Sequence, residues 1–173
     1  LTAYYALHQL ANISAGDRVL IHAAAGGVGL AVLQLAQQAG AEIFATAGSP
    51  RKRTLLRAMG VQHIMSSRTL DFAGQIMDLT GGEGVDIVLN SLAGDFIHKS
   101  FEVLKPNGRF IEIGKTGVWD EAEVTRLMPE ARYWVFFLGQ AIQEQPDLIQ
   151  TMFRTLMDSM ESGALKPLPY HVF

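Results

Sequence analysis

The chain has 173 residues, of which 49% are hydrophobic, which suits one domain with a sizeable core and is too short for two domains of ordinary size. Its net charge of −3 argues against nucleic-acid binding, and the absence of cysteine excludes disulfides, thiolate metal ligands and a thiol nucleophile. The five histidines lack metal-ligand spacing, and no apolar run reaches the roughly 18 residues of a membrane span. We therefore expect a cytoplasmic protein without a metal site or membrane contact.

The first ten residues have apolar side chains at helical spacing but no capping residue before them. They predict that the chain begins inside a helix, so we expect it to be a piece of a longer polypeptide. The next apolar run, Arg18-Val-Leu-Ile21, is short and continuous, which is typical of a buried parallel strand.

A glycine-rich stretch, His22-Ala-Ala-Ala-Gly-Gly-Val-Gly29, follows this strand. Its small residues have the spacing of the dinucleotide fingerprint, with alanine in the first place, and the N–H groups opening the next helix would face an anion. A loop that merely needs positive φ is the alternative. The strand before the turn and the helical apolar pattern over 30–39 favour nucleotide binding. The expected cofactor contacts are Ala24, Gly26, Gly27, Val28 and Gly29.

The choice of cofactor can be argued from the second strand, predicted over 43–46. Domains that prefer NAD usually carry an acid at the carboxyl end of this strand, whereas a 2′-phosphate needs room and positive charge. Glu42 lies at the opposite end, and the carboxyl end leads into Gly48-Ser-Pro-Arg-Lys-Arg53. We therefore predict NADPH, bound through Ser49, Lys52 and Arg53, with a solvated basic helix face as the alternative.

The alternation of strands and helices then continues, with further strands expected over 63–65, 85–89 and 109–113 and helices over 55–59, 72–79 and 96–104. A turn is expected over 106–108, a short helix within 119–128, a sixth strand over 132–138 and a helix over 148–160 whose methionine and leucine stripe forms core. The pattern predicts an α/β fold, a doubly wound parallel (Rossmann) sheet of about six strands with helices on both faces.

Ligands of such sheets lie beyond the carboxyl ends of the strands. Asn90 offers an amide to ribose or pyrophosphate oxygens there, and Gly114 lets the chain pass close to a flat ring. Lys115 is the ammonium nearest the expected nicotinamide, where it could bond the cofactor or protonate a substrate carbanion, unless it is a solvated loop lysine. The further expected contacts are Arg68, Asn90, Ser91, Leu92, Gly114 and Lys115.

Several segments together resemble the enoyl reductase domain of modular type I polyketide synthases, in the zinc-free branch of the medium-chain dehydrogenase/reductases. They are Leu1-Thr-Ala-Tyr-Tyr-Ala-Leu7, the glycine-rich stretch 22–29, Ser66-Ser-Arg68, Thr80-Gly-Gly82, Val88-Leu-Asn-Ser-Leu-Ala93 and Glu112-Ile-Gly-Lys115. The similarity runs from Leu1 to about Val118 and continues more weakly to the end. The Asn-Ser-Leu-Ala and Gly-Lys-Thr segments are more specific to this group than the glycine-rich turn.

The resemblance implies NADPH-dependent reduction of an α,β-unsaturated thioester on an acyl carrier protein, with hydride going to the β carbon and a proton to the α carbon. It implies that Thr2 lies near the nicotinamide, that Ser49 and Lys52 lie at the 2′-phosphate and that Lys115 is the proton donor. Neighbouring synthase domains are the expected partners. Residues 1–173 would be the NADPH-binding domain, inactive without a substrate domain that this chain lacks.

Two departures from the family pattern concern the protonation route. Gly117 and Phe137 stand where the family commonly has acids, the second of which partners the lysine. Three alternatives to enoyl reduction stay open: reductive ring closure of a β-substituted enoyl thioester, a quinone oxidoreductase, and a non-catalytic NADPH-binding module.

Overall fold

The computed structural model describes residues 1–169, and its strands form one parallel sheet in that part of the chain. The strands are β1 (Arg18–Ile21), β2 (Glu42–Ala47), β3 (His63–Ser66), β4 (Val85–Asn90), β5 (Leu104–Glu112) and β6 (Arg132–Val135). Their order across the sheet is β3-β2-β1-β4-β5-β6, which confirms the predicted doubly wound Rossmann sheet.

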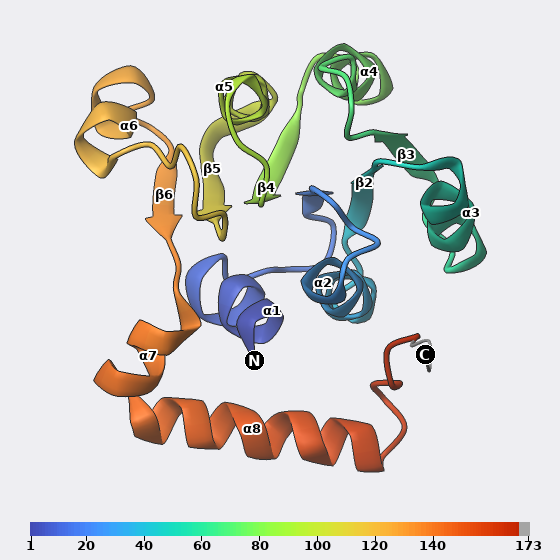
Figure 1. Ribbon diagram of the computed structural model, residues 1–173, viewed down its shortest axis with the longest axis vertical. Helices are drawn as coiled ribbons and strands as arrows, with labels where there is room; N and C mark the ends of the chain where they lie inside the picture. The colour runs from blue at the N-terminus through green and yellow to red at the C-terminus, as the bar shows by residue number, and fades with distance from the viewer. Residues whose placement is uncertain (170–173) are drawn as a thin grey trace.

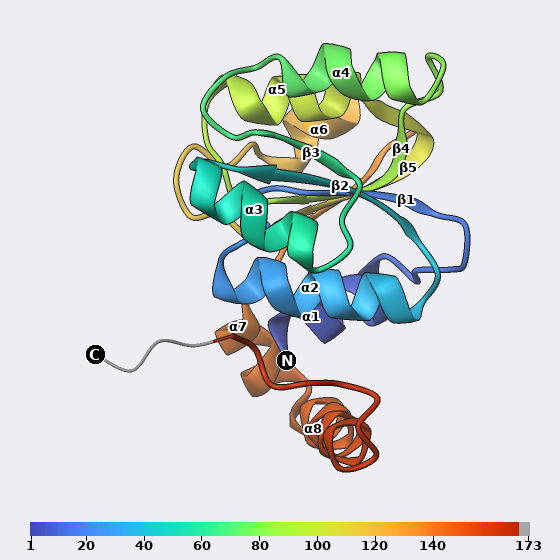
Figure 2. The same cartoon turned by 90° about the vertical axis from the view of Figure 1, so that its right-hand side faces the viewer.

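Helices cover both faces of the sheet, as Figures 1 and 2 show. One face carries α4 (Phe72–Leu79), α5 (Asp95–Glu102) and α6 (Glu121–Leu127). The opposite face carries α1 (Thr2–Tyr4), the π-helix η1 (Tyr5–Leu10), α2 (Gly27–Gln38) and α3 (Pro50–Ala58). The predicted first helix is therefore present, but its second half has π rather than α geometry.

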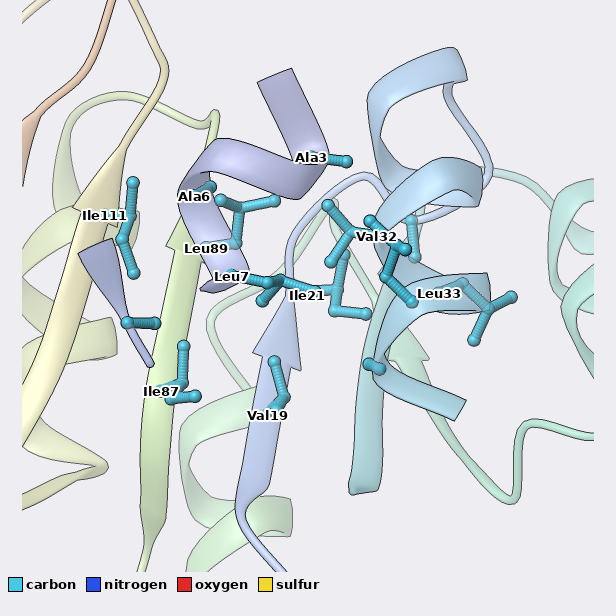
Figure 3. Close-up of a cluster of buried hydrophobic side chains, with 14 of the residues drawn as sticks. Ala3, Ala6, Leu7, Val19, Ile21, Val32, Leu33, Ile87, Leu89 and Ile111 are labelled. Atoms are coloured by element: carbon cyan, nitrogen blue, oxygen red, sulfur yellow. The ribbon is translucent and has the colours of Figure 1, made fainter. Parts of the chain in front are cut away.

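The core forms two layers because the strands are apolar on both faces. Figure 3 shows the layer under α1 and α2, where Leu7 and Leu33 meet Ile21 and Leu89 from the middle of the sheet. In the other layer, Phe72 of α4 and Ile97 of α5 pack against the opposite face of the sheet, to which Phe110 of β5 contributes. This double burial fixes the strand ends, and the loops that follow them, relative to one another.

Three sequence predictions around β5 and β6 are wrong: a helix end, a turn and a strand end. The helix expected to reach Leu104 ends at Glu102, and Leu104 already pairs with Val85 of β4. The turn expected over 106–108 lies inside β5 as a bulge, where Asn107 has a φ of 60°. The strand expected over 132–138 ends at Val135, and Phe137 caps α7 (Leu138–Glu144), a helix that the sequence pattern did not predict. Packing overrides the β propensity of these aromatic residues.

The last helix, α8 (Pro146–Glu161), confirms the predicted helix but corrects the prediction that its whole apolar stripe is core. Ile149 and Met152 are buried, whereas Phe153 and Met160 are 54% and 49% exposed. The reason is position: α8 lies outside the layer of α1 and α2, so one edge of its apolar face is covered within residues 1–169. The extended tail expected over 166–173 is without regular structure through Pro169, and the rest of it lies outside the described residues.

The strand order reverses between β1 and β4, which are neighbours although β2 and β3 lie between them in the sequence. In open α/β sheets, ligands bind outside the carboxyl ends of the strands at such a reversal. The loops after β1, β2, β4 and β5 therefore define the candidate site.

Candidate nucleotide-binding site

The glycine-rich turn packs tightly against the start of α2. A Cβ on Gly29 would lie 2.6 Å from the backbone of Ala24, so only glycine allows the helix to start this close to the turn. Gly27 behaves differently, because a Cβ there would meet nothing within 4 Å. Gly26, Gly27 and Val28 are all exposed, so this side of the turn is open to a ligand.

The first N–H groups of α2 are directed at that open side. The earliest helical hydrogen bond runs from Leu30 N–H to the Gly26 carbonyl at 2.8 Å, and in the described chain no side chain caps the helix at Gly26. The N–H groups of Gly27, Val28 and Gly29 therefore lack helical acceptors. Together with the dipole of a twelve-residue helix, they suit a pyrophosphate.

Positive charge gathers at the carboxyl end of β2. Arg53 Nη1 donates to the Ala47 carbonyl at 3.2 Å, so its guanidinium is tied to the strand end. The Arg68 side chain lies against Gly48, where a Cβ would be 2.9 Å from Arg68 Nε. Ser49 caps α3 by accepting the Lys52 N–H at 3.3 Å.

The acid near this strand lies at its other end. Glu42 begins β2, which confirms its predicted place at the opposite end of the strand. Its carboxylate pairs with Arg18 at 3.0 Å and with His63 at 3.1 Å. The chain from Gly48 to Arg53 contains no carboxylate. The charge at the carboxyl end of β2 therefore suits a phosphate better than a pair of ribose hydroxyls.

Asn90 is completely buried, and its side-chain amide bonds within the protein. Asn90 Nδ2 donates to Glu112 Oε2 at 2.5 Å and to the Leu92 carbonyl at 2.7 Å, while Asn90 Oδ1 accepts the Leu92 N–H at 3.1 Å. These bonds shape the loop after β4, which leaves Ser91 exposed and Leu92 half-buried. The cofactor contact predicted for the Asn90 amide stays a prediction, and in this structure the amide positions the loop.

Glu112 was not among the predicted site residues, yet it connects two of the site's loops. Its carboxylate bonds Asn90 at the end of β4 and accepts the Gly114 N–H at 2.6 Å in the loop after β5. Burial raises the pKa of the Glu112 carboxyl, and the bonds from Asn90 and Gly114 oppose that rise. An acid within the apolar strand pattern 109–113 was the signal in the sequence that could have found it.

Lys115 follows this loop and is exposed. Within the described residues no ion pair holds its ammonium group. Phe137, where the resemblance led us to expect an acid, is 39% exposed and has no charge with which to orient a lysine. Thr2, at the start of α1, is half-buried, and α1 packs beside α2.

Comparison with known proteins decides the family. A family model described as zinc-binding dehydrogenase matches residues 27–157. The nucleotide-binding subdomain of the enoylreductase domain of PpsC from Mycobacterium tuberculosis is 40% identical, with a TM-score of 0.87, over 96% of this chain and 94% of that chain. The chain belongs to the polyketide synthase enoyl reductases. The resemblance seen in the sequence is thereby confirmed.

Two longer structures are more similar over this region than the PpsC subdomain is. The CurK enoyl reductase is 55% identical with a TM-score of 0.95, and the CurF ER cyclopropanase from the curacin A biosynthetic pathway is 45% identical with the same TM-score. Each is matched over 99% of this chain, which spans 52% of the first structure and 51% of the second. The phthioceranic/hydroxyphthioceranic acid synthase of Mycobacterium tuberculosis is 44% identical over 97% of this chain, and the chain spans 8% of its length.

Two further observations on this enoyl reductase chain concern metal binding and membrane-spanning helices. Residues 1–169 contain no group of three His, Cys, Asp or Glu side chains that could hold a metal ion, so they do not fit the zinc named by the family description. No helix among these residues is long and apolar enough to cross a membrane.

Proposed function

We propose that this chain binds NADPH and forms the cofactor half of an enoyl reductase that saturates an α,β-unsaturated acyl thioester on an acyl carrier protein. The observation that carries the choice of cofactor is the basic carboxyl end of β2. There Arg53 bonds the Ala47 carbonyl, Arg68 lies against Gly48, and the chain from Gly48 to Arg53 has no carboxylate. Family membership supports the reaction. NADPH supplies the hydride when it is bound.

The residues divide the binding of the cofactor between two groups. The open N–H groups of Gly27, Val28 and Gly29 hold the pyrophosphate, since they have no helical acceptor. Arg53 and Arg68, with Lys52 and the Ser49 hydroxyl, hold the 2′-phosphate. A guanidinium can form paired hydrogen bonds to a phosphate, whereas an ammonium acts as a point charge.

The loops after β4 and β5 flank the nicotinamide. The Asn90–Glu112–Gly114 hydrogen bonds fix these loops relative to each other, and Lys115 extends from the second loop into solvent in this chain. Lys115 donates the proton to the α carbon after hydride addition to the β carbon. Because Phe137 replaces the acid, Lys115 acts without a carboxylate partner at that position.

Residues outside this chain complete the enzyme. The chain spans about half of the CurK and CurF structures, so a substrate domain from the rest of the polypeptide encloses the acyl chain. Neighbouring synthase domains and the acyl carrier protein are the partners. We place the enzyme in the cytoplasm, where NADPH is supplied.

The direct test is turnover of a crotonyl thioester by the full-length enzyme with NADPH, with the product identified by mass spectrometry. Appearance of the saturated butyryl thioester with equal NADPH consumption supports the proposal. Turnover of quinones but not of enoyl thioesters contradicts it, as does cofactor binding with no turnover of either.

Reductive ring closure has one specific observation in its favour, the 45% identity to the CurF cyclopropanase. A substrate with a leaving group on the γ carbon separates the two outcomes. Hydride addition followed by protonation keeps the leaving group, whereas ring closure expels it as the α carbon attacks the γ carbon. Because identity to the CurK reductase is higher, at 55%, we expect the leaving group to be kept.

A further inference from the structure

His22, the first residue of the glycine-rich stretch, is 2% exposed and hydrogen-bonded through both ring nitrogens. Its Nδ1 lies 3.0 Å from the hydroxyl of Thr46 on β2, and its Nε2 lies 2.7 Å from the hydroxyl of Ser100 on α5. The rings of Phe72 and Phe96 meet the imidazole edge-on. His22 is therefore enclosed by uncharged groups on all the elements that face it.

The donors and acceptors in this cluster can be counted. The Ser100 hydroxyl donates its one proton to the Phe96 carbonyl at 2.6 Å, so it must accept from His22 Nε2–H. A neutral imidazole then leaves Nδ1 as an acceptor, and the Thr46 hydroxyl donates to it. Burial lowers the pKa of His22 to about 3, in keeping with a neutral ring.

The other end of this chain of hydrogen bonds lies in the glycine-rich turn. With its proton directed at His22, the Thr46 hydroxyl accepts the Ala23 N–H at 3.2 Å. The Thr46 carbonyl accepts the next N–H, that of Ala24, at 2.9 Å. One threonine therefore holds two successive backbone groups of the turn, and His22 fixes which way its hydroxyl points.

Ala23 needs such support because its backbone is left-handed. Its φ is +49°, a conformation that residues with a Cβ adopt at an energetic cost. The Ala23 carbonyl also accepts the Gly26 N–H at 2.9 Å, which closes the turn directly before α2. The conformation of Ala23 thereby sets where the open N–H groups of α2 point.

We propose that His22, as the neutral Nε2–H tautomer, is a positioning residue for the cofactor turn and acts through Thr46 on Ala23. It does not touch the cofactor. This inference rests on the proposed function, because the turn it positions is the one to which we assign the pyrophosphate of NADPH. It adds a role for three buried polar side chains, those of His22, Thr46 and Ser100, which the cofactor contacts do not use.

The test compares Thr46→Val with Thr80→Val in this chain. Both threonines are buried and both hydroxyls accept a backbone N–H, but Thr80 accepts that of Gly84, beside the amino end of β4. Loss of one buried hydrogen bond near the cofactor corresponds to about a tenfold change in affinity. We expect Thr46→Val to weaken NADPH binding about tenfold, Thr80→Val to leave it unchanged and Thr46→Ser to restore it.

A second measurement does not depend on the cofactor. In ¹⁵N-labelled chain, the His22 ring should show a protonated nitrogen at Nε2 and an unprotonated one at Nδ1, and Thr46→Val should accelerate hydrogen exchange at Ala23 N–H. A ring protonated at Nδ1, or equal NADPH affinity in the Thr46→Val and wild-type chains, would overturn the inference. If the wild-type chain binds neither NADPH nor NADH, the proposed function fails first and the cofactor role of His22 fails with it.

Discussion

The Glu112 carboxylate lies so close to the Gly114 backbone that only glycine fits at position 114. Glu112 Oε1 accepts the Gly114 N–H at 2.6 Å, and a Cβ on Gly114 would lie at the same distance from the same oxygen. A side chain at position 114 would displace the carboxylate from both Gly114 and Asn90. The loop that carries Lys115 therefore depends on this glycine.

Gly114→Ala should accordingly lower the free energy of unfolding by about 2 kcal/mol, the value of a hydrogen bond to a charged group. Gly74→Ala is the matched control, since Gly74 is an exposed position in α4 with nothing within 4 Å of an added Cβ. That control should gain about 0.5–1 kcal/mol from helix propensity. Urea unfolding measures both, and equal stability of the two variants would contradict the role given to Gly114.

Gly48→Asp should change cofactor preference. Its Cβ would lie 2.9 Å from Arg68 Nε, and its carboxylate would stand at the carboxyl end of β2, where it repels a 2′-phosphate and accepts from ribose hydroxyls. We expect at least about a tenfold loss of NADPH affinity, equivalent to 1.4 kcal/mol, and a gain for NADH. Fluorescence titration measures both affinities.

Two arginine variants are controls for this shift. Arg68→Ala should lower the affinity for NADPH and leave the affinity for NADH unchanged, because it removes a guanidinium without adding an acid. Arg57→Ala, in the last turn of α3, should change neither affinity. If Arg57→Ala and Arg68→Ala weaken NADPH binding equally, the effect comes from the overall charge of the chain, and the assigned phosphate site is wrong.

The buried imidazole of His22 makes stability depend on pH. Its pKa is lowered to about 3 in the folded chain and is about 6.5 when unfolded, so the unfolded state binds a proton that the folded state excludes. Stability is unaffected by this group above pH 6.5 and falls as the pH drops from 6.5 towards 3. Between pH 7.5 and pH 5 the loss should be about 2 kcal/mol.

Urea unfolding of the wild type and of His22→Gln at the two pH values measures this dependence. The variant should be less stable at both pH values but should lack this part of the pH dependence. NMR titration of the wild-type ring is independent of whether the variant folds. A His22 ring that titrates near pH 6.5 in the folded chain would show that the imidazole is not excluded from protonation.

Lys115→Ala in the full-length enzyme should reduce kcat for the enoyl thioester at least about tenfold. A general acid typically contributes at least about 10²-fold to the rate, and water can replace part of that contribution. NADPH affinity should change less than kcat. Lys99→Ala is the control, since Lys99 is paired with Glu102 on α5. An unchanged kcat for Lys115→Ala would remove the proton-donor role.

The sequence predicted those features that follow from repeated local patterns. Apolar runs such as Val19 to Ile21 are buried on both faces and became the central strands, and the spacing of Ala24, Gly26 and Gly29 located the turn at the sheet's reversal point. The basic residues after β2 lie at the predicted strand end. Their contacts with a cofactor stay predictions.

Features that depend on tertiary contacts were missed or misplaced. The Phe136-Phe137 pair has high β propensity, yet the strand ends before it because α7 begins at Leu138. The pairing of Asn90 with Glu112 joins residues 22 positions apart, and His22 meets Ser100 across 78 positions. No local pattern specifies such partners, although a polar residue within or directly after a buried strand does indicate that a partner exists.

The preference for NADPH, which carries a 2′-phosphate, over NADH, which lacks one, decides whether the proposed function holds. The decisive measurement is the dissociation constant of this chain for NADPH and for NADH, with Lys52→Ala titrated alongside the wild type. We predict that NADPH binds at least about tenfold more tightly than NADH, and that the substitution removes part of this preference while leaving NADH affinity unchanged. Equal affinities for the two nucleotides in the wild type, or binding of neither, would contradict the proposed function.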